Sequence, residues 1–193
     1  MKLAIGLGNP GRAYAGTRHN AGWMALDEMA RRHGAVFHRA GLRPVQTAKL
    51  ALDGVGAVAL VKPLTYMNLS GTVLPALMRK SGATPADLVV VLDDVSLPLG
   101  TIRVRAGGSA GGHHGLESVI EHVGTQDVAR VRVGIGTAAR EGRDLKDYVL
   151  EPLSAADREA LEASAARAAD AVETLLRDGA DKAMNEYNER RRT

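Results

Sequence analysis

The sequence predicts a single α/β domain built on a mostly parallel, mixed and twisted sheet with helices on both faces. Apolar runs of strand length alternate along the chain with longer segments whose apolar residues recur at helical spacing. The length of 193 residues suits one domain with a core of its own, and no repeat or linker divides the chain. We expect one domain over residues 1–193, with a lid-like segment around 137–154 and C-terminal helices over 155–192.

The predicted strands are short apolar runs that end in turn residues or polar residues. Asp53 and Gly54 separate the second run from the third and are a turn pair typical of a β-hairpin. The fourth run reads LVVVLD, and an unbroken apolar strand of this kind indicates a central position with both faces covered. The runs cover residues 2–7, 46–52, 55–62, 88–93, 101–105 and 129–135.

The predicted helices follow from apolar residues at helical spacing. The first covers residues 21–33, and others are expected over 70–81 and near 116–123. The alanine-rich segment 155–177 is the longest, and Gly179 ends it. Because strands and helices alternate, we expect parallel strands joined by helical connections.

The composition is that of an ordinary globular protein and excludes some classes of site. Hydrophobic residues make up 45% of the chain and charged residues 24%. The chain has no cysteine, which excludes disulfides and thiolate metal ligands and favours a cytoplasmic location. The apolar run at residues 3–7 is too short for a signal peptide or a membrane span. With a net charge of only +3, nucleic-acid binding would depend on local clusters of arginine.

The stretch GLGNPG at residues 6–11 matches the G-x-G-x-x-G pattern of dinucleotide-binding loops. In such a loop the third glycine opens a helix whose N-terminus meets the pyrophosphate, but here the first helix begins only near Asn20. The acidic residue expected at the end of the second strand is also missing, because Asp27 and Glu28 lie inside that helix. The stretch therefore predicts a strand-to-loop turn and no cofactor site.

The stretch GGSAG at residues 107–111 matches the G-x-S-x-G pattern of serine hydrolases. The last histidine of the chain is His122, and the acids before it, Glu117 and Glu121, would share one short helix with it. That helix cannot reach back around Ser109 to form a triad, so a flexible loop that contacts phosphate or peptide is the better interpretation. A serine esterase that uses Ser109 stays an alternative.

Four polar stretches follow predicted strands, at residues 9–20, 62–71, 93–94 and 111–115. Ligand sites in open α/β sheets gather at the carboxyl ends of strands, so we expect these stretches to converge. Taken singly, their residues are explained as helix caps, turn formers or surface residues. Taken together, they indicate a functional site. His113 and His114 predict no metal site, because adjacent side chains diverge and no nearby spacing of acids or histidines completes one.

Two predicted strands carry arginines at alternate positions. Arg103 and Arg105 in one strand, and Arg130 and Arg132 in the other, alternate with valine, so each pair points to one face. A solvated face of the sheet would explain one such pair. Arg105 and Arg132 lie near the ends of their strands, where two guanidinium groups could clamp a phosphate.

The polar stretches together resemble the bacterial-type peptidyl-tRNA hydrolases. GLGNPG-x-x-Y-x-x-T-R-H-N-x-G at residues 6–22 is similar to the opening signature of that family, and K-P-x-T-Y-M-N-x-S-G at 62–71 to its second. The residues from Asp93 to Gly100, followed by GGSAGGHHGL at 107–116, resemble the third signature, and RVGIG at 132–136 the fourth. DYVL at 147–150 is similar to the segment before the last helix. The similarity runs in order over nearly the whole chain.

The resemblance implies an enzyme that hydrolyses the ester between a peptide, or an N-blocked amino acid, and the 3′ ribose of tRNA. His19 would be the catalytic base, Asp93 would orient it, and Asn9 would position the substrate. Arg105 and Arg132 fall where the family grips the 5′ phosphate. The groove for the peptide and the tRNA end would be formed by Tyr14, Tyr66, Met67, Asn68, His113 and His114.

The chemistry of these residues suits hydrolysis without a metal or a cofactor. Histidine has a reference pKa near ~6.5 and is largely neutral at cytoplasmic pH, so it can take a proton from water. A carboxylate on the other ring nitrogen fixes the tautomer and stabilises the imidazolium. Asn68 and backbone amides could donate to the oxyanion. We expect peptidyl-tRNA as the partner, no membrane, and a monomer, because no heptad or long apolar edge demands a second chain.

Two positions depart from the family pattern, and one alternative function follows from it. His114 stands where the family has Asn, and an imidazole cannot offer the donor and acceptor of an amide together. Residues 137–139 read TAA where His-Pro is expected, and this loop would border the lid. A non-catalytic, splicing-factor-like RNA-binding relative is the alternative, and the intact set of His19, Asp93 and Asn68 favours the enzyme over it.

Overall fold

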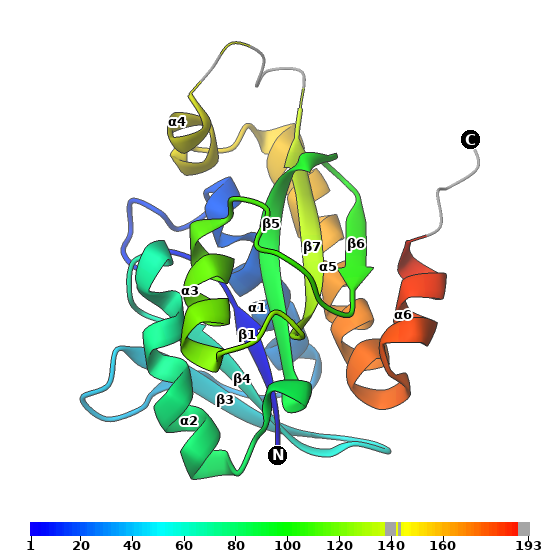
Figure 1. Ribbon diagram of the computed structural model, residues 1–193. Coiled ribbons are helices and arrows are strands. Elements are labelled where there is room, and N and C mark those ends of the chain that lie inside the picture. Colours follow the sequence, from blue (N-terminus) through cyan, green and yellow to red (C-terminus); the bar gives the residue numbers. More distant parts are fainter. Residues whose placement is uncertain (138–141, 143, 189–193) are drawn as a thin grey trace.

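A computed structural model of the protein describes residues 1–137, 142 and 144–188 (Figure 1). Within them the strands form one seven-stranded sheet in the order β2-β3-β4-β1-β5-β7-β6. Strands β4, β1, β5 and β7 run parallel, and β2, β3 and β6 pair antiparallel with their neighbours. The strands are β1 (Lys2–Gly6), β2 (His38–Arg39), β3 (Val45–Leu52), β4 (Gly56–Pro63), β5 (Leu88–Pro98), β6 (Ile102–Arg105) and β7 (Ala129–Gly136).

Helices cover both faces of the sheet, which confirms the predicted fold class. Figure 1 shows α2 and α3 in front of the sheet and α1 and α5 behind it. The helices are α1 (Ala21–Arg32), α2 (Leu74–Ser81), α3 (His114–Val123), α4 (Leu145–Leu150), α5 (Ala155–Asp178) and α6 (Ala180–Tyr187), with 3-10 turns η1 (Arg18–Asn20), η2 (Met67–Val73) and η3 (Pro85–Asp87). No helix among the described residues is long and apolar enough to cross a membrane.

The central strand β5 shows why its sequence is apolar without a break. Val89 and Val91 pack into the cluster under α1 and α5, whereas Val90 and Leu92 pack into the cluster under α2 and α3. Successive side chains of a strand point to opposite faces, so a strand covered on both faces buries every residue.

The segment 70–81 is not the continuous helix that the sequence predicts. It begins with the 3-10 turn η2, and α2 starts only at Leu74. The reason is a close crossing with α3: the Gly71 N–H donates to Ser118 Oγ at 3.0 Å, and a Cβ at position 71 would overlap the Ser118 carbonyl. Pro75 then lies in the first turn of α2, where its missing N–H costs no hydrogen bond.

The predicted end of the fourth strand at residue 93 is also wrong. Strand β5 continues to Pro98, and its pairing with β7 shifts register between Asp94 and Pro98. Asp93 therefore lies inside a strand, paired with Val133 of β7, rather than in a turn. Two short elements, β2 and α4, were not predicted, because two to six residues carry too little periodicity to identify them.

The lid-like segment and the C-terminal helices extend beyond what the structure describes. Residues 138–141 and 143 of the expected lid, and 189–192 of the expected C-terminal helices, lie outside the described residues. Within them, α4 occupies the later part of the lid-like segment, and α5 and α6 occupy the C-terminal part.

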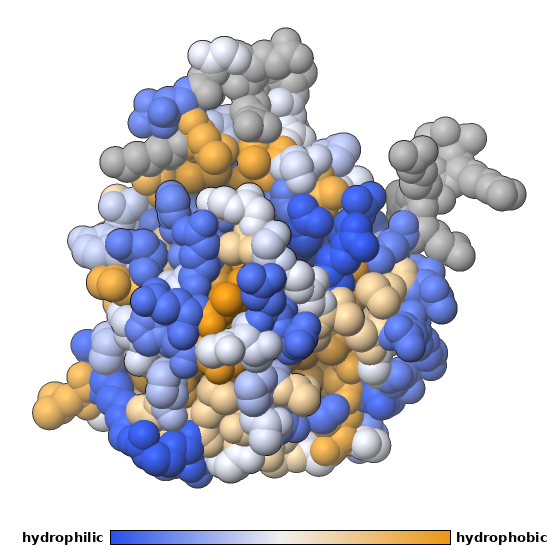
Figure 2. Space-filling model, viewed as in Figure 1, coloured by the Kyte–Doolittle hydropathy of each residue, from blue (hydrophilic) through white to orange (hydrophobic). Residues whose placement is uncertain are grey.

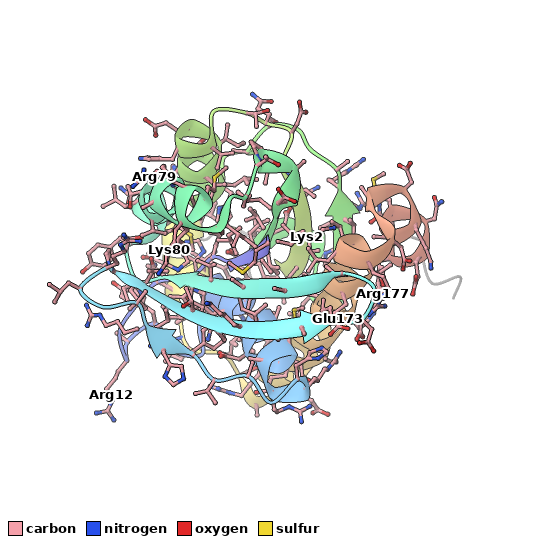
Figure 3. The ribbon with its side chains drawn as sticks, turned by 90° about the horizontal axis from the view of Figure 1, so that it is seen from below. Lys2, Arg12, Arg79, Lys80, Glu173 and Arg177 are labelled. Carbon is pink, nitrogen blue, oxygen red and sulfur yellow. The ribbon has the colours of Figure 1, made fainter. Side chains whose placement is uncertain are left out.

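A side chain that follows α6 forms hydrogen bonds with the backbone of the outer strand β6. The Val104 N–H donates to Asn188 Oδ1 at 2.7 Å, and Asn188 Nδ2 donates to the Val104 carbonyl at 2.9 Å. On the underside, seen in Figure 3, Lys2 Nζ donates to the Leu176 carbonyl at 2.6 Å and ties β1 to α5. Arg79 and Lys80 also lie on this side, exposed at the C-terminal end of α2.

The first turn of α1 lies directly against the backbone of the sheet. A Cβ at position 22 would lie 2.6 Å from Leu7 N and would overlap the Val91 carbonyl, so only Gly22 fits there. This contact places η1, which precedes α1, over the carboxyl ends of β1 and β5. The position of His19 therefore depends on this glycine.

We expect Gly22→Ala to lower the free energy of unfolding by about 1–3 kcal/mol, because the backbone atoms around it cannot move aside. The matched control is Gly115→Ala, a helix glycine whose nearest neighbour is the flexible Met67 side chain. Urea denaturation of both variants is the measurement. Equal destabilisation by the two substitutions would contradict the claim that the backbone around Gly22 cannot move aside.

Candidate active site

The polar stretches converge on one cleft of about 1180 Å³ at the carboxyl ends of the parallel strands. On the face shown in Figure 2, hydrophilic residues dominate the middle of the molecule, and apolar side chains gather above them near α4. Every site residue predicted from the sequence lines this cleft: Asn9, Tyr14, His19, Tyr66, Met67, Asn68, Asp93, Arg105, His113, His114 and Arg132.

Asp93 is the buried centre of the cleft floor, with only 4% of its surface exposed. His19 Nδ1 lies 2.9 and 3.0 Å from its two carboxylate oxygens, and His113 Nε2 lies 3.0 Å from Oδ1. Burial by itself would raise the pKa of Asp93, but the charges and hydrogen bonds of His19 and His113 lower it below its ordinary value. The carboxylate is therefore ionised and accepts hydrogen bonds from both imidazoles.

The hydrogen bonds fix different tautomers for the two histidines. The Leu116 N–H donates to His113 Nδ1 at 3.2 Å, so neutral His113 carries its proton on Nε2 and donates it to Asp93. His19 donates to Asp93 through Nδ1, which leaves its Nε2 with a free lone pair. Although the two rings lie 5.5 Å apart, only His19 has a basic nitrogen available.

The environment of His19 acts on its pKa in opposite directions. Burial lowers the pKa of His19, whereas the negative charge of Asp93 and the hydrogen bond to it raise it. The net result is a pKa above the ordinary value of 6.5. His19 therefore binds a proton more strongly than a free imidazole does, which suits a base.

The same residues form the one cluster among the described parts of the chain that could hold a metal ion. Ligand atoms of His19, Asp93 and His113 lie within 4.8 Å of one another. No nearby spacing in the sequence indicates this cluster, because the two partners of His113 come from distant segments. A metal on His113 Nε2 would move the ring proton to Nδ1, where it would face the Leu116 N–H. The hydrogen bonds favour a proton-transfer site over a metal site.

Asn9 and Asn20 form a second polar cluster beside His19. Asn20 accepts from the Asn9 N–H at 2.8 Å and donates to the Asn9 carbonyl at 3.1 Å, so it holds the loop after β1. Asn9 Oδ1 accepts from the Met67 N–H at 2.8 Å. The amide nitrogen of Asn9 is then left as a donor at the cleft. Asn20 lies in a polar stretch of the sequence, but nothing in its spacing indicates this contact.

The residues expected to form the groove divide into an outer and an inner group. Tyr66 and Asn68 are exposed, and the His114 side chain is 77% exposed, with Nδ1 lying 3.0 Å from Glu117 Oε2. Met67 is buried, and His113 turns inward to Asp93. The inner residues support the site from behind, and the outer ones face the open cleft.

The arginines of β6 and β7 share one face of the sheet. Arg103 stands opposite Arg132, and Arg105 opposite Arg130, so Arg105 and Arg132 are diagonal neighbours. Arg132 donates to Asp94, and it lies in the middle of β7 rather than near its end as predicted. Arg105 is exposed and ends β6.

Arg130 does not belong to a solvated face, contrary to the sequence-based explanation. It is 2% exposed, and its guanidinium donates to the carbonyls of residues 108, 109, 126 and 128 at 2.7–3.1 Å. These bonds hold the glycine-rich loop in place. Burial and the nearby charge of Arg132 lower the pKa of Arg130.

Ser109 has no triad around it among the described residues. Its carbonyl accepts from Arg130, and no hydrogen bond joins its hydroxyl to a histidine. His122 Nδ1 bonds the Ser118 carbonyl on α3, and Glu117 pairs with His114. The loop from residue 6 to residue 11 likewise leads into further loop, and α1 begins only at Ala21, as expected for a turn.

Comparison with known proteins places the whole chain among proteins of one kind. A family model described as peptidyl-tRNA hydrolase matches residues 3–193. A peptidyl-tRNA hydrolase of Rubrobacter xylanophilus is 53% identical over 186 residues, which cover 96% of this chain and 99% of that protein. A peptidyl-tRNA hydrolase of Symbiobacterium thermophilum is 46% identical over 187 residues, which cover 97% of this chain and 98% of that protein. The crystal structure of peptidyl-tRNA hydrolase from Acinetobacter baumannii matches with a TM-score of 0.86 at 29% identity. The match covers 97% of this chain and 94% of that one.

We expect the pKa of His19 to lie above 6.5 and to fall in Asp93→Asn, because burial would then act without the opposing charge. NMR titration of the imidazole is the measurement. The control is Asp94→Asn, whose carboxylate bonds Arg132 and Ser96 rather than His19, and which should leave the titration unchanged. An unmoved pKa in Asp93→Asn would contradict the assigned pairing.

Proposed function

This chain belongs to the peptidyl-tRNA hydrolase family, and on that premise we propose that it cleaves the ester between a peptide, or an N-blocked amino acid, and the 3′ ribose of tRNA by general-base catalysis. The observation that carries the mechanism is the pairing of His19 with Asp93, which leaves Nε2 as a free base on the cleft. In this mechanism no protein nucleophile is needed, because an ester is activated enough for water.

The reaction begins when His19 Nε2 takes a proton from a water molecule. The water oxygen attacks the ester carbonyl carbon and forms a tetrahedral intermediate. The bond from that carbon to the ribose O3′ then breaks, and His19 returns its proton to O3′. The products are a peptide with a free carboxyl group and tRNA with a free 3′ hydroxyl. Asp93 stabilises the imidazolium that exists between the two proton transfers.

The groups around the base have separate tasks in this proposal. His113 and the Leu116 N–H keep Asp93 in place without competing for the proton. Asn9 presents its amide nitrogen to the substrate carbonyl or blocking group, and Asn68, exposed at the cleft, donates to the oxyanion. Such a donor contributes on the order of 3 kcal/mol to stabilising the transition state.

The two ends of the substrate would lie against different walls of the cleft. Arg105, with Arg132 diagonal to it, faces the tRNA end and would contact a phosphate. Leu145, Val149 and Leu150 of α4 form an apolar wall that suits the acyl side. A monomer suffices for this mechanism, because all of these described residues come from one chain.

The test of function is release of tRNA from N-acetylaminoacyl-tRNA, with the unblocked ester assayed in parallel and a chelator present. We expect turnover of the blocked ester only, and a loss of kcat on the order of 10²–10⁴ in His19→Ala. His122→Ala is the control, since that histidine bonds the Ser118 carbonyl outside the cleft.

Full activity in His19→Ala would overturn the mechanism. Tight tRNA binding without turnover in the wild-type protein would favour the RNA-binding alternative. Labelling by a fluorophosphonate together with loss of activity in Ser109→Ala would favour the serine esterase.

The phosphate assignment predicts a change in the salt dependence of tRNA binding. Each lost phosphate contact should lower the slope of log K against log salt by roughly one. We therefore expect Arg105→Gln to weaken binding and flatten the slope. Arg79→Gln removes the same charge from the underside and should change neither (Figure 3). Equal effects of the two substitutions would show that only net charge matters.

A further inference from the structure

Arg18, the residue directly before His19, is a buried cation that the proposed mechanism does not use. Only 2% of its surface is exposed. Its Nη1 donates to Glu151 Oε1 at 2.9 Å and to the Tyr148 carbonyl at 3.4 Å, and its Nη2 donates to Asp157 Oδ2 at 2.6 Å. Its guanidinium carbon lies 4.4 Å from the centre of the Tyr148 ring. Each of these partners is more than 120 residues away in the chain.

The partners of Arg18 lie in α4, directly after it and at the start of α5. Tyr148 is fully buried in α4, and its hydroxyl donates to the Ile135 carbonyl at 2.5 Å, at the end of β7. Thr17 also forms a bridge with Pro152, just beyond α4. The turn that carries His19 is thus fastened directly to α4, which Figure 1 shows above the carboxyl ends of the strands.

Only a guanidinium can make this set of contacts. Its planar fork bridges two carboxylates while its face stacks on an aromatic ring, whereas an ammonium is a point charge without a face. Because the Arg18 side chain is only 3% exposed, loss of either carboxylate would leave a buried guanidinium with a single charged partner. Arg18 therefore fixes the geometry of α4 relative to η1, together with the bridge between Thr17 and Pro152.

α4 also contributes an apolar wall to the cleft. Leu145, Val149 and Leu150 line the cleft, while Tyr148 is buried and packs its ring against Arg18. A group bound against this wall is consequently held at a fixed position relative to His19. A displacement of about 1 Å at a reacting centre can cost on the order of 10²-fold in rate.

We propose that Arg18 is a positioning residue that makes α4 and the His19 turn one rigid unit, so that an acyl group bound on α4 is held in register with the catalytic base. This inference rests on the proposed function. It predicts that Arg18 affects the rate by fixing the position of α4 relative to His19, and not by changing the protonation of His19.

The test measures kcat and KM of Arg18→Lys on N-acetylaminoacyl-tRNA, well below the unfolding temperature found by circular dichroism. We expect kcat to fall on the order of tenfold. The acid limb of the pH–rate profile should lie at the same pH in the variant as in the wild-type protein. Leu145→Ala should lower kcat/KM in the wild-type background and change it less than twofold when Arg18→Lys is already present. If Arg18→Lys fails to fold, Glu151→Gln, which removes one charge of the pair, takes its place.

The matched control is Arg32→Lys. Arg32 also joins two carboxylates, Glu28 and Asp170, and fastens α1 to α5, but it touches neither the cleft nor α4. It should lose stability without loss of kcat. An inactive wild-type protein would refute the proposed function itself. An active wild-type protein with equal kcat in both lysine variants, or additive effects of Arg18→Lys and Leu145→Ala, would overturn the positioning role alone.

Discussion

The buried carboxylate of Asp93 is the group on which the site depends. A carboxylate inside a protein takes up a proton unless partners hold its charge, and here two imidazoles do so. They arrive from different layers: His19 precedes α1 on one face of the sheet, and His113 opens α3 on the other. The interaction therefore joins both helical layers to the central strand. A single backbone N–H, that of Leu116, then decides which imidazole is the base.

Several polar residues near the cleft hold backbone rather than face a ligand. Asn20 bonds both backbone groups of Asn9, and Arg130 collects the carbonyls of the glycine-rich loop. Loops of this kind have few regular hydrogen bonds, and a buried backbone group without a partner is costly. Side chains that supply those bonds make irregular loops rigid, and a rigid loop can place Asn9 and Asn68 where the chemistry needs them.

Features that depend on local pattern could be predicted from the sequence, whereas features that depend on contacts between distant segments could not. The apolar run through Val89 and Val91 identified the central strand, because burial on both faces leaves that pattern. The same pattern could not show that the strand continues past Asp93, since residues 94–98 are polar or mixed. His19 and Asp93 were found through a family resemblance. The inward turn of His113 and the burial of Arg18 and Arg130 depend on how separate segments pack against one another, which no spacing in the sequence encodes.

The side-chain amide of Asn188 affects whether two copies of the protein can pair through the edges of their sheets. The outer strands of a sheet present backbone groups that a second chain can pair with, which is how sheets join edge to edge. Here the outer strands are β2, of two residues, and β6, of four. On β6 the side chain of Asn188 occupies both backbone groups of Val104, with Arg103 and Arg105 on either side. One amide and two like charges thus stand where a further strand would add, and the sheet offers no template for intermolecular growth at that edge.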